Sequence, residues 1–101
     1  MTKGDRKQCD ALYQAILTLE NLEECRAFFE DLCTVTELKA MEQRFEVAML
    51  LKEGMIYNDI LERTGASSAT ISRVNRALNY GADGYQRVLP RVKKMEKDEN
   101  P

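Results

Sequence analysis

The segment Thr64–Leu78, TGASSATISRVNRAL, places small hydroxyl-bearing side chains ahead of two arginines, Arg73 and Arg76. It carries no charge before Arg73, in a chain whose net charge is −2. Hydroxyl groups donate hydrogen bonds to phosphates or base edges, and arginine binds phosphate or guanine with two donors. Short side chains at the start of a helix allow it to enter the major groove of DNA. These residue types favour contact with nucleic acid.

The apolar spacing around this segment predicts two helices that position the polar groups. A first short helix contains Ile60 and Leu61 and ends at Gly65, which permits a positive φ angle. A second helix begins after Ser67 as N-cap and stops at Gly81. The arrangement is typical of a helix-turn-helix, and a simple helical hairpin capped by serines is the alternative. The buried side is expected to hold Ile71, Val74 and Leu78, and the DNA-binding residues are expected to be Ser67, Ser68, Ala69, Thr70, Ser72, Arg73 and Arg76.

Charge is distributed unevenly along the chain. Residues 1–62 contain 7 basic and 13 acidic side chains, whereas residues 63–94 contain 7 basic and 1 acidic. A cationic segment in an acidic chain favours contact with a polyanion, although a solvated charged face is the alternative. Electrostatic support for DNA binding is expected from Arg63, Arg87, Lys93 and Lys94.

Catalytic and metal chemistry have few suitable residues in this sequence. The chain has no histidine, and its cysteines (Cys9, Cys25 and Cys33) form no C-x-x-C pair, so we expect neither a metal site nor a cofactor. We expect all three cysteines to be reduced and to act as small apolar side chains on helices. Glu42 and Glu46 are four residues apart, but a solvated helix face accounts for them. An enzyme is therefore not expected.

The remaining apolar pattern predicts an all-α fold of about six helices without strands. We expect one domain over residues 8–97, with residues 8–54 mainly in dimerisation helices, 56–81 in the helix-turn-helix and 84–97 in a C-terminal helix. Flexible tails are expected at residues 1–7 and 98–101. No apolar run approaches the roughly 20 residues of a membrane span, and the N-terminus lacks a signal-peptide core, so a cytoplasmic location is expected.

Local signals refine the limits of these helices. Asn21 and Thr36 are expected N-caps, Gly54 is an expected stop, and Pro90 is expected to kink or restart the last helix. The aromatic and leucine stripes of the first helices exceed what a short helix pair can bury, which favours a homodimer. The expected stripes are Leu12, Ala15, Ile16, Leu19 and Leu22; Cys25, Phe28, Phe29 and Leu32; Leu38, Met41, Phe45, Ala48 and Leu51; and Tyr85, Val88, Val92 and Met95.

The string LLKEGMIYNDILERTGASSATISRVNRAL resembles the DNA-binding region of the Trp repressor superfamily. The string ATISRVNRALNYG resembles in particular its Trp-repressor-like YerC/YecD family. The strong match covers about Leu50 to Gly81, and the helical layout is compatible from about residue 10 to 95. The resemblance implies an intertwined, all-helical homodimer that binds double-stranded operator DNA and regulates transcription, as a repressor. A helical protein–protein interaction module that does not bind DNA is the alternative.

The resemblance also implies a corepressor site, from which this chain departs. Arg73 matches an arginine that holds the corepressor in Trp repressor, but the next residue is Val74 instead of the glycine that leaves room for indole. In Trp repressor a second arginine binds the corepressor. Its position aligns with Gln43 when no gap is introduced, or with Arg44 when the alignment has a gap of one residue. A small-molecule effector would therefore be expected near Arg44 and Arg73, and we do not expect it to be tryptophan.

Overall fold

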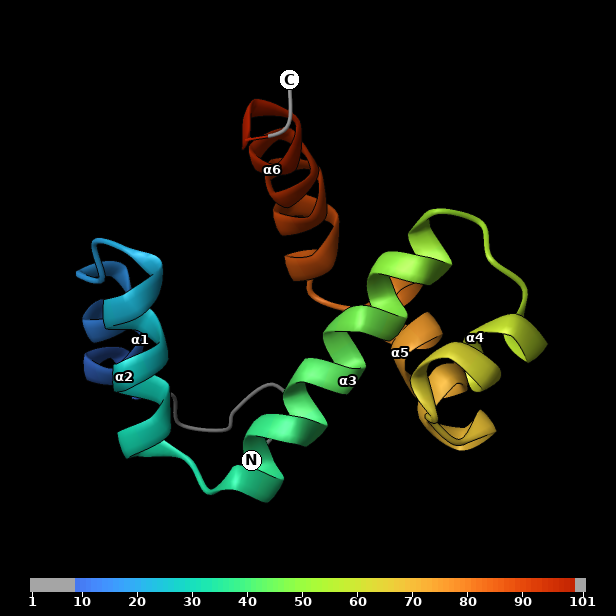
Figure 1. Cartoon of the computed structure of the whole chain (residues 1–101), viewed down its shortest axis with the longest axis horizontal. Helices are drawn as coiled ribbons and strands as arrows, with labels where there is room; N and C mark the ends of the chain where they lie inside the picture. The colour runs from blue at the N-terminus through green and yellow to red at the C-terminus, as the bar shows by residue number, and fades with distance from the viewer. Residues whose placement is uncertain (1–8, 100–101) are drawn as a thin grey trace. The chain divides into compact units, whose positions relative to one another are not determined.

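In a computed structural model, residues 9–99 are described, and these residues form six α-helices and no strand (Figure 1). The expected all-α fold is confirmed. None of these helices has the length and apolar character needed to cross a membrane. The helices are α1 (Asp10–Leu17), α2 (Leu22–Leu32), α3 (Val35–Lys52), α4 (Tyr57–Thr64), α5 (Ser68–Tyr80) and α6 (Gly84–Glu99).

The chain divides into two compact units, Met1–Leu38 and Lys39–Pro101. The boundary lies inside α3, so most of this helix belongs with the helix-turn-helix rather than with the expected dimerisation segment of residues 8–54. The single domain expected over residues 8–97 stays a prediction. The tail expected at residues 1–7 lies outside the described residues, as do the last two residues of the tail expected at 98–101, whereas residues 98 and 99 belong to α6.

The first unit contains α1 and α2, and neither helix has a buried residue. Asn21 caps α2 as expected, since its side-chain oxygen accepts from the backbone N–H of Glu24 at 2.8 Å. The stripe expected from Leu12 to Leu22 does not lie on one helix, because α1 already ends at Leu17. Thr18 is the C-cap of α1, and its hydroxyl donates to the carbonyl of Ala15 at 2.6 Å.

The N-terminus of α3 is capped by Thr34 rather than by the expected Thr36. The N–H of Glu37 donates to Thr34 Oγ1 at 3.1 Å, and the N–H of Thr34 donates to Glu37 Oε1 at 2.8 Å. This reciprocal capping box needs an acidic or amide residue three positions after the threonine, and Thr36 has Lys39 there. The backbone and side-chain hydrogen bonds from Thr34 lower the pKa of the Glu37 carboxyl from its ordinary value.

The second unit packs the C-terminal half of α3 against α4, α5 and α6. Within this unit α4 and α5 lie side by side next to α3 (Figure 1). The helix α3 stops before Gly54, as expected, with the N–H groups of Gly54 and Met55 donating to the carbonyls of Leu51 and Leu50. The buried core comprises Val47, Ala48, Leu50, Ile60, Ala66, Ile71, Val74, Leu78 and Leu89.

The last helix, α6, differs from its expected form in two ways. It continues through Pro90 without restarting, although proline removes one backbone donor from the helix. Its buried residue is Leu89, whereas the expected Val88 and Met95 are exposed. Tyr85 packs beside this core and Val92 is half-buried, so these two expected residues lie on the inner face and Leu89 takes the place expected for Val88.

The capping geometry predicts unequal effects for two neighbouring threonines. Thr34→Ala should lower the free energy of unfolding by about 1 kcal/mol, because it removes the cap and its reciprocal bond to Glu37. Thr36→Ala is the matched control and should leave stability unchanged or slightly raised, since Thr36 lies within the helix and alanine favours helix. Urea unfolding followed by circular dichroism measures both, and an equal effect of the two changes would contradict the assignment of the cap.

Candidate nucleic-acid interface

The recognition helix of the candidate interface is α5, and its inner side is fixed by the core. Ile71, Val74 and Leu78 are buried there, as the three- and four-residue spacing predicts. On α4, Ile60 is fully buried and Leu61 packs beside it. Packing on one side of α5 requires the residues between these positions to face outward.

The turn between α4 and α5 is short and internally bonded. Gly65 has the left-handed conformation, with φ 72°, that ends α4 and that most side chains rarely adopt. The hydroxyl of Thr64 donates to the carbonyl of Ile60 at 2.8 Å and accepts from the N–H of Ala66 at 3.1 Å. Ala66 is buried, and its small side chain allows α4 and α5 to approach each other. This turn therefore sets the angle at which α5 leaves α4.

The outer side of α5 presents most of the expected DNA-binding residues to solvent. The exposed positions between its buried residues carry short side chains first and the two arginines afterwards. The structure therefore brings the expected DNA-binding residues together on α5 and at its N-cap. Thr70 is half-buried, whereas Ser67, Ser68, Ala69, Ser72, Arg73 and Arg76 are exposed. One face of α5 can thus offer hydroxyl donors, a methyl group and two guanidinium groups to a single partner.

The first turn of α5 has an additional property that suits an anion. Ser67 caps the helix, because its Oγ accepts from the N–H of Thr70 at 3.1 Å and donates to Thr70 Oγ1 at 3.1 Å. The hydroxyl of Ser67 therefore has a structural role besides the expected contact. The first turn of α5 contains no acidic residue, so its helix dipole is not neutralised locally.

The supporting basic residues occupy positions outside α5. Arg63 is exposed on α4, and Arg87 and Lys93 are exposed on α6. The side chain of Lys94 lies outside the described residues. Both helices belong to the same compact unit as α5, so this unit carries the candidate interface together with Arg63, Arg87 and Lys93.

Two glutamines connect the helix-turn-helix to its neighbours, and no sequence pattern predicted either contact. Gln43 on α3 donates through Nε2 to the carbonyl of Thr64 at 3.3 Å. Gln86 on α6 donates through Nε2 to the carbonyl of Leu78 at 2.8 Å. The sequence separations are 21 and 8 residues, which lie outside local capping patterns. Only the packed fold reveals these contacts.

The expected effector residues lie on two different helices, and an effector site there stays a prediction. Arg44 is exposed on α3 and Arg73 is exposed on α5, and neither lines the hollows described below. Val74 is 2% exposed and lies among the core residues of the second unit. Its side chain therefore packs on the inner side of α5, whereas Arg73 is exposed. Val74 stands at the position where the resemblance to Trp repressor requires a glycine.

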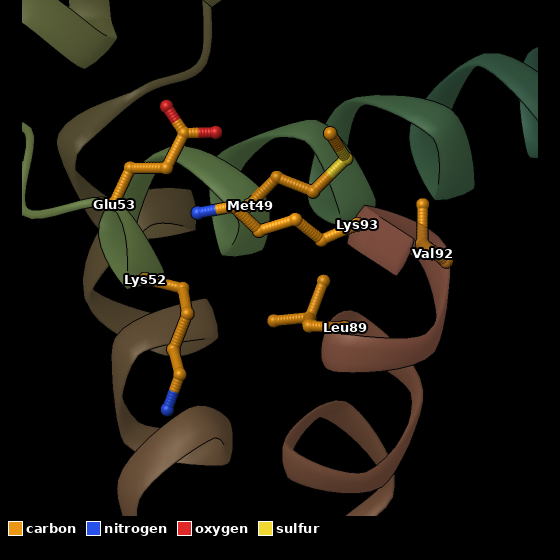
Figure 2. A pocket seen from close by; sticks show the side chains of 6 residues that line it. All are labelled: Met49, Lys52, Glu53, Leu89, Val92 and Lys93. Atoms are coloured by element: carbon orange, nitrogen blue, oxygen red, sulfur yellow. The ribbon is translucent and has the colours of Figure 1, made fainter. Parts of the chain in front are cut away.

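Two hollows occur on the second unit, and both are poor sites for a charged small molecule. The first, about 90 Å³, lies between α3 and α6, well below the 300–1,000 Å³ of ordinary ligand pockets. Figure 2 shows its lining side chains: Met49, Lys52, Glu53, Leu89, Val92 and Lys93. The second is broad, open and without a charged lining residue: Phe45, Ala77, Ala82, Gly84, Tyr85 and Val88.

Comparison with known proteins gives consistent matches over most of the chain. The family model described as Trp repressor protein matches residues 7–93. An uncharacterised protein of Bacillus subtilis, YerC, is 54% identical over 90 residues, which cover 89% of this chain and 86% of that protein.

Two solved structures are also similar. The crystal structure of a candidate Trp repressor from Staphylococcus aureus has a TM-score of 0.80 and 52% identity, over 83% of this chain and 84% of that one. The crystal structure of a TrpR-like protein from Eubacterium eligens has a TM-score of 0.80 and 58% identity, over 83% and 87% of the two chains.

Proposed function

Because this chain belongs to the Trp repressor family, we propose that it is a sequence-specific DNA-binding regulator of transcription. It acts as a homodimer on operator DNA in the cytoplasm and represses the genes that the operator controls. Its helix-turn-helix, α4 and α5, enters the major groove with the N-terminal turns of α5 leading. The chain has no role as an enzyme in this proposal.

The observation that carries the proposal is the outer face of α5. Short side chains occupy its exposed positions from Ser68 to Ser72, and Arg73 and Arg76 follow on the same exposed side. The fully buried Ile71 on the opposite side holds this face outward. Ser68, Ala69 and Ser72 can approach base edges and thymine methyl groups, while the arginines reach guanine or phosphate. The N–H of Thr70 already donates to Ser67 Oγ, so the amides that precede it at the N-terminus of α5 are the donors for a phosphate.

The homodimer is supported by the apolar surface that a single chain leaves uncovered. Leu17 is 83% exposed and Leu22 is 64% exposed in the first unit, which buries none of the residues of α1 or α2. In the second unit, Val88 is exposed beside the open apolar hollow. Apolar surface of this extent normally marks an interface between chains. We propose that a second copy covers it.

Any effector of this regulator differs from tryptophan. Val74 stands where the resemblance to Trp repressor requires a glycine. It is packed in the core, and its β-branched side chain has little rotameric freedom to move aside. The proposed protein either binds DNA constitutively or responds to a smaller ligand near Arg44 and Arg73.

DNA binding is tested by Arg76→Ala, which removes an exposed guanidinium and leaves the buried side of α5 intact. The target is a duplex selected from a random-sequence pool by the wild-type protein. If Arg76 contacts a base edge, binding should weaken by about 1–3 kcal/mol with relaxed preference at one base pair. If it contacts a phosphate, all sequences should lose affinity and the salt slope should fall by about one unit.

The matched control is Arg26→Ala, which removes the same charge from an exposed position on α2. It should change operator affinity much less than Arg76→Ala. Equal affinities of wild type and Arg76→Ala would exclude Arg76 from the interface. Failure of the wild type to select any duplex, or binding that is insensitive to salt, would support the protein-interaction alternative.

Dimerisation is tested by sedimentation equilibrium at micromolar concentration. The expected mass is about twice that of the 11.6 kDa chain, because the apolar surface of α1 and α2 needs a partner. The two recognition helices should then lie roughly 34 Å apart and select a near-palindromic site. A well-folded monomer under these conditions would rule out the dimer.

The response to tryptophan is tested by isothermal titration with and without selected duplex. We expect no binding below millimolar concentration and no change in DNA affinity. Overpacking of the kind that Val74 would cause costs about 1–3 kcal/mol, which lowers ligand affinity by about one to two orders of magnitude. A saturable micromolar isotherm that Arg73→Ala abolishes would show that Val74 leaves the site open.

A further inference from the structure

Each helix of the helix-turn-helix has a carbonyl in its last turn that accepts a hydrogen bond from a glutamine of another helix. The last four carbonyls of an α-helix have no partner within that helix and need a donor from elsewhere. At the end of α4, the carbonyl of Thr64 accepts from Gln43 Nε2 on α3. Near the end of α5, the carbonyl of Leu78 accepts from Gln86 Nε2 on α6. The two glutamines thus supply tertiary C-caps at 3.3 and 2.8 Å.

Both side chains are held in place by more than one interaction. Gln43 and Gln86 are half-buried, so their stems pack within the fold. The carbonyl oxygen Oε1 of Gln86 accepts from Lys52 Nζ on α3 at 2.7 Å while its Nε2 donates to α5. This amide therefore uses both of its ends and links α3, α6 and α5. Thr64, the partner of Gln43, is itself bonded to Ile60 and Ala66 through its hydroxyl.

The two bonds restrain α5 at its opposite ends. Gln43 acts just before the start of α5, through the turn that follows Thr64. Gln86 acts at Leu78, two residues before the last residue of α5. A helix of 13 residues is about 20 Å long, so these two points together resist both tilt and rotation of the helix. Apolar packing alone tolerates small rotations more readily, since it is not directional.

We propose that Gln43 and Gln86 are positioning residues that hold α5 in its DNA-reading orientation without a bound effector. The proposal rests on the proposed function, because it concerns the affinity of α5 for DNA. A base-edge contact depends on the direction of each donor, whereas a phosphate contact depends mainly on charge. Loss of either bond therefore weakens binding to a selected sequence more than binding to an unrelated sequence.

The test compares binding to two duplexes: one selected by the wild type from a random pool and a scrambled duplex of equal composition. Gln43→Met and Gln86→Met keep the length and helix propensity of the side chain and remove the amide donor. Each should lower the ratio of selected to scrambled affinity by about 2- to 10-fold, the range expected for one hydrogen bond. Gln14→Met, at an exposed position on α1, is the matched control and should keep the wild-type ratio.

A rescue variant separates positioning from a general loss of stability. Gln43→Lys keeps a donor long enough to reach the Thr64 carbonyl, and its ratio should return towards the wild-type value. Assays are made well below the unfolding temperature of each variant. Proton exchange of the side-chain amides in the wild type gives a readout that needs neither DNA nor a variant. The amides of Gln43 and Gln86 should exchange more slowly than that of Gln14.

The outcomes distinguish this inference from the proposed function. A wild type that selects no duplex overturns the proposed function and this inference with it. A wild type that selects a duplex, combined with unchanged ratios in both methionine variants, overturns the inference alone. Equal losses on the selected and scrambled duplexes also overturn it, as does amide exchange in Gln43 and Gln86 as fast as in Gln14.

Discussion

Burial of Val47, Ile60 and Ile71 in one core is the constraint on which the helix-turn-helix depends. These side chains come from α3, α4 and α5, and all are fully buried. An eight-residue helix such as α4 is too short to be stable in water by itself, so it forms because Ile60 packs against α3 and α5. The same contact fixes which side of α5 faces the core, and the position of Arg73 and Arg76 on the outer side follows from helical geometry.

Charge is segregated in a way that complements this geometry. The acidic residues are concentrated in residues 1–62, and the cationic residues in 63–94, which include α5 and most of α6. A chain with a net charge of −2 has little general attraction for polyanions. In the proposed function, the local excess of arginine and lysine attracts DNA to one part of the molecule, while the rest of the surface has little attraction for it. DNA affinity would then depend on the approach of α5.

The sequence predicted those features that depend on neighbouring residues. The caps at Asn21 and Ser67 and the left-handed Gly65 depend on residues only a few positions away. Where two local signals competed the prediction was wrong: Thr34 and Thr36 are both plausible caps, and the partner Glu37 decides between them. On α6, Pro90 obscured the pattern, and the buried position was assigned one residue too early.

The glutamine contacts could not be predicted, because Gln43 finds Thr64 only after α3 and α4 have packed. The exposure of the candidate DNA-binding residues could be predicted from helical spacing, since all of them lie on α5 or at its N-cap. Their individual contacts stay predictions, because the direction of a base-edge bond depends on the partner as well as on α5.

The absence of buried residues in α1 and α2 gives the proposed dimer a consequence for protein turnover. Segments with few buried contacts open with little free-energy cost and are the first to be cut by proteases. A chain without a partner would expose residues 10–32 in this way, while an assembled pair would protect them. Surplus subunits would be removed selectively, so the cell would retain this regulator mainly in its assembled form.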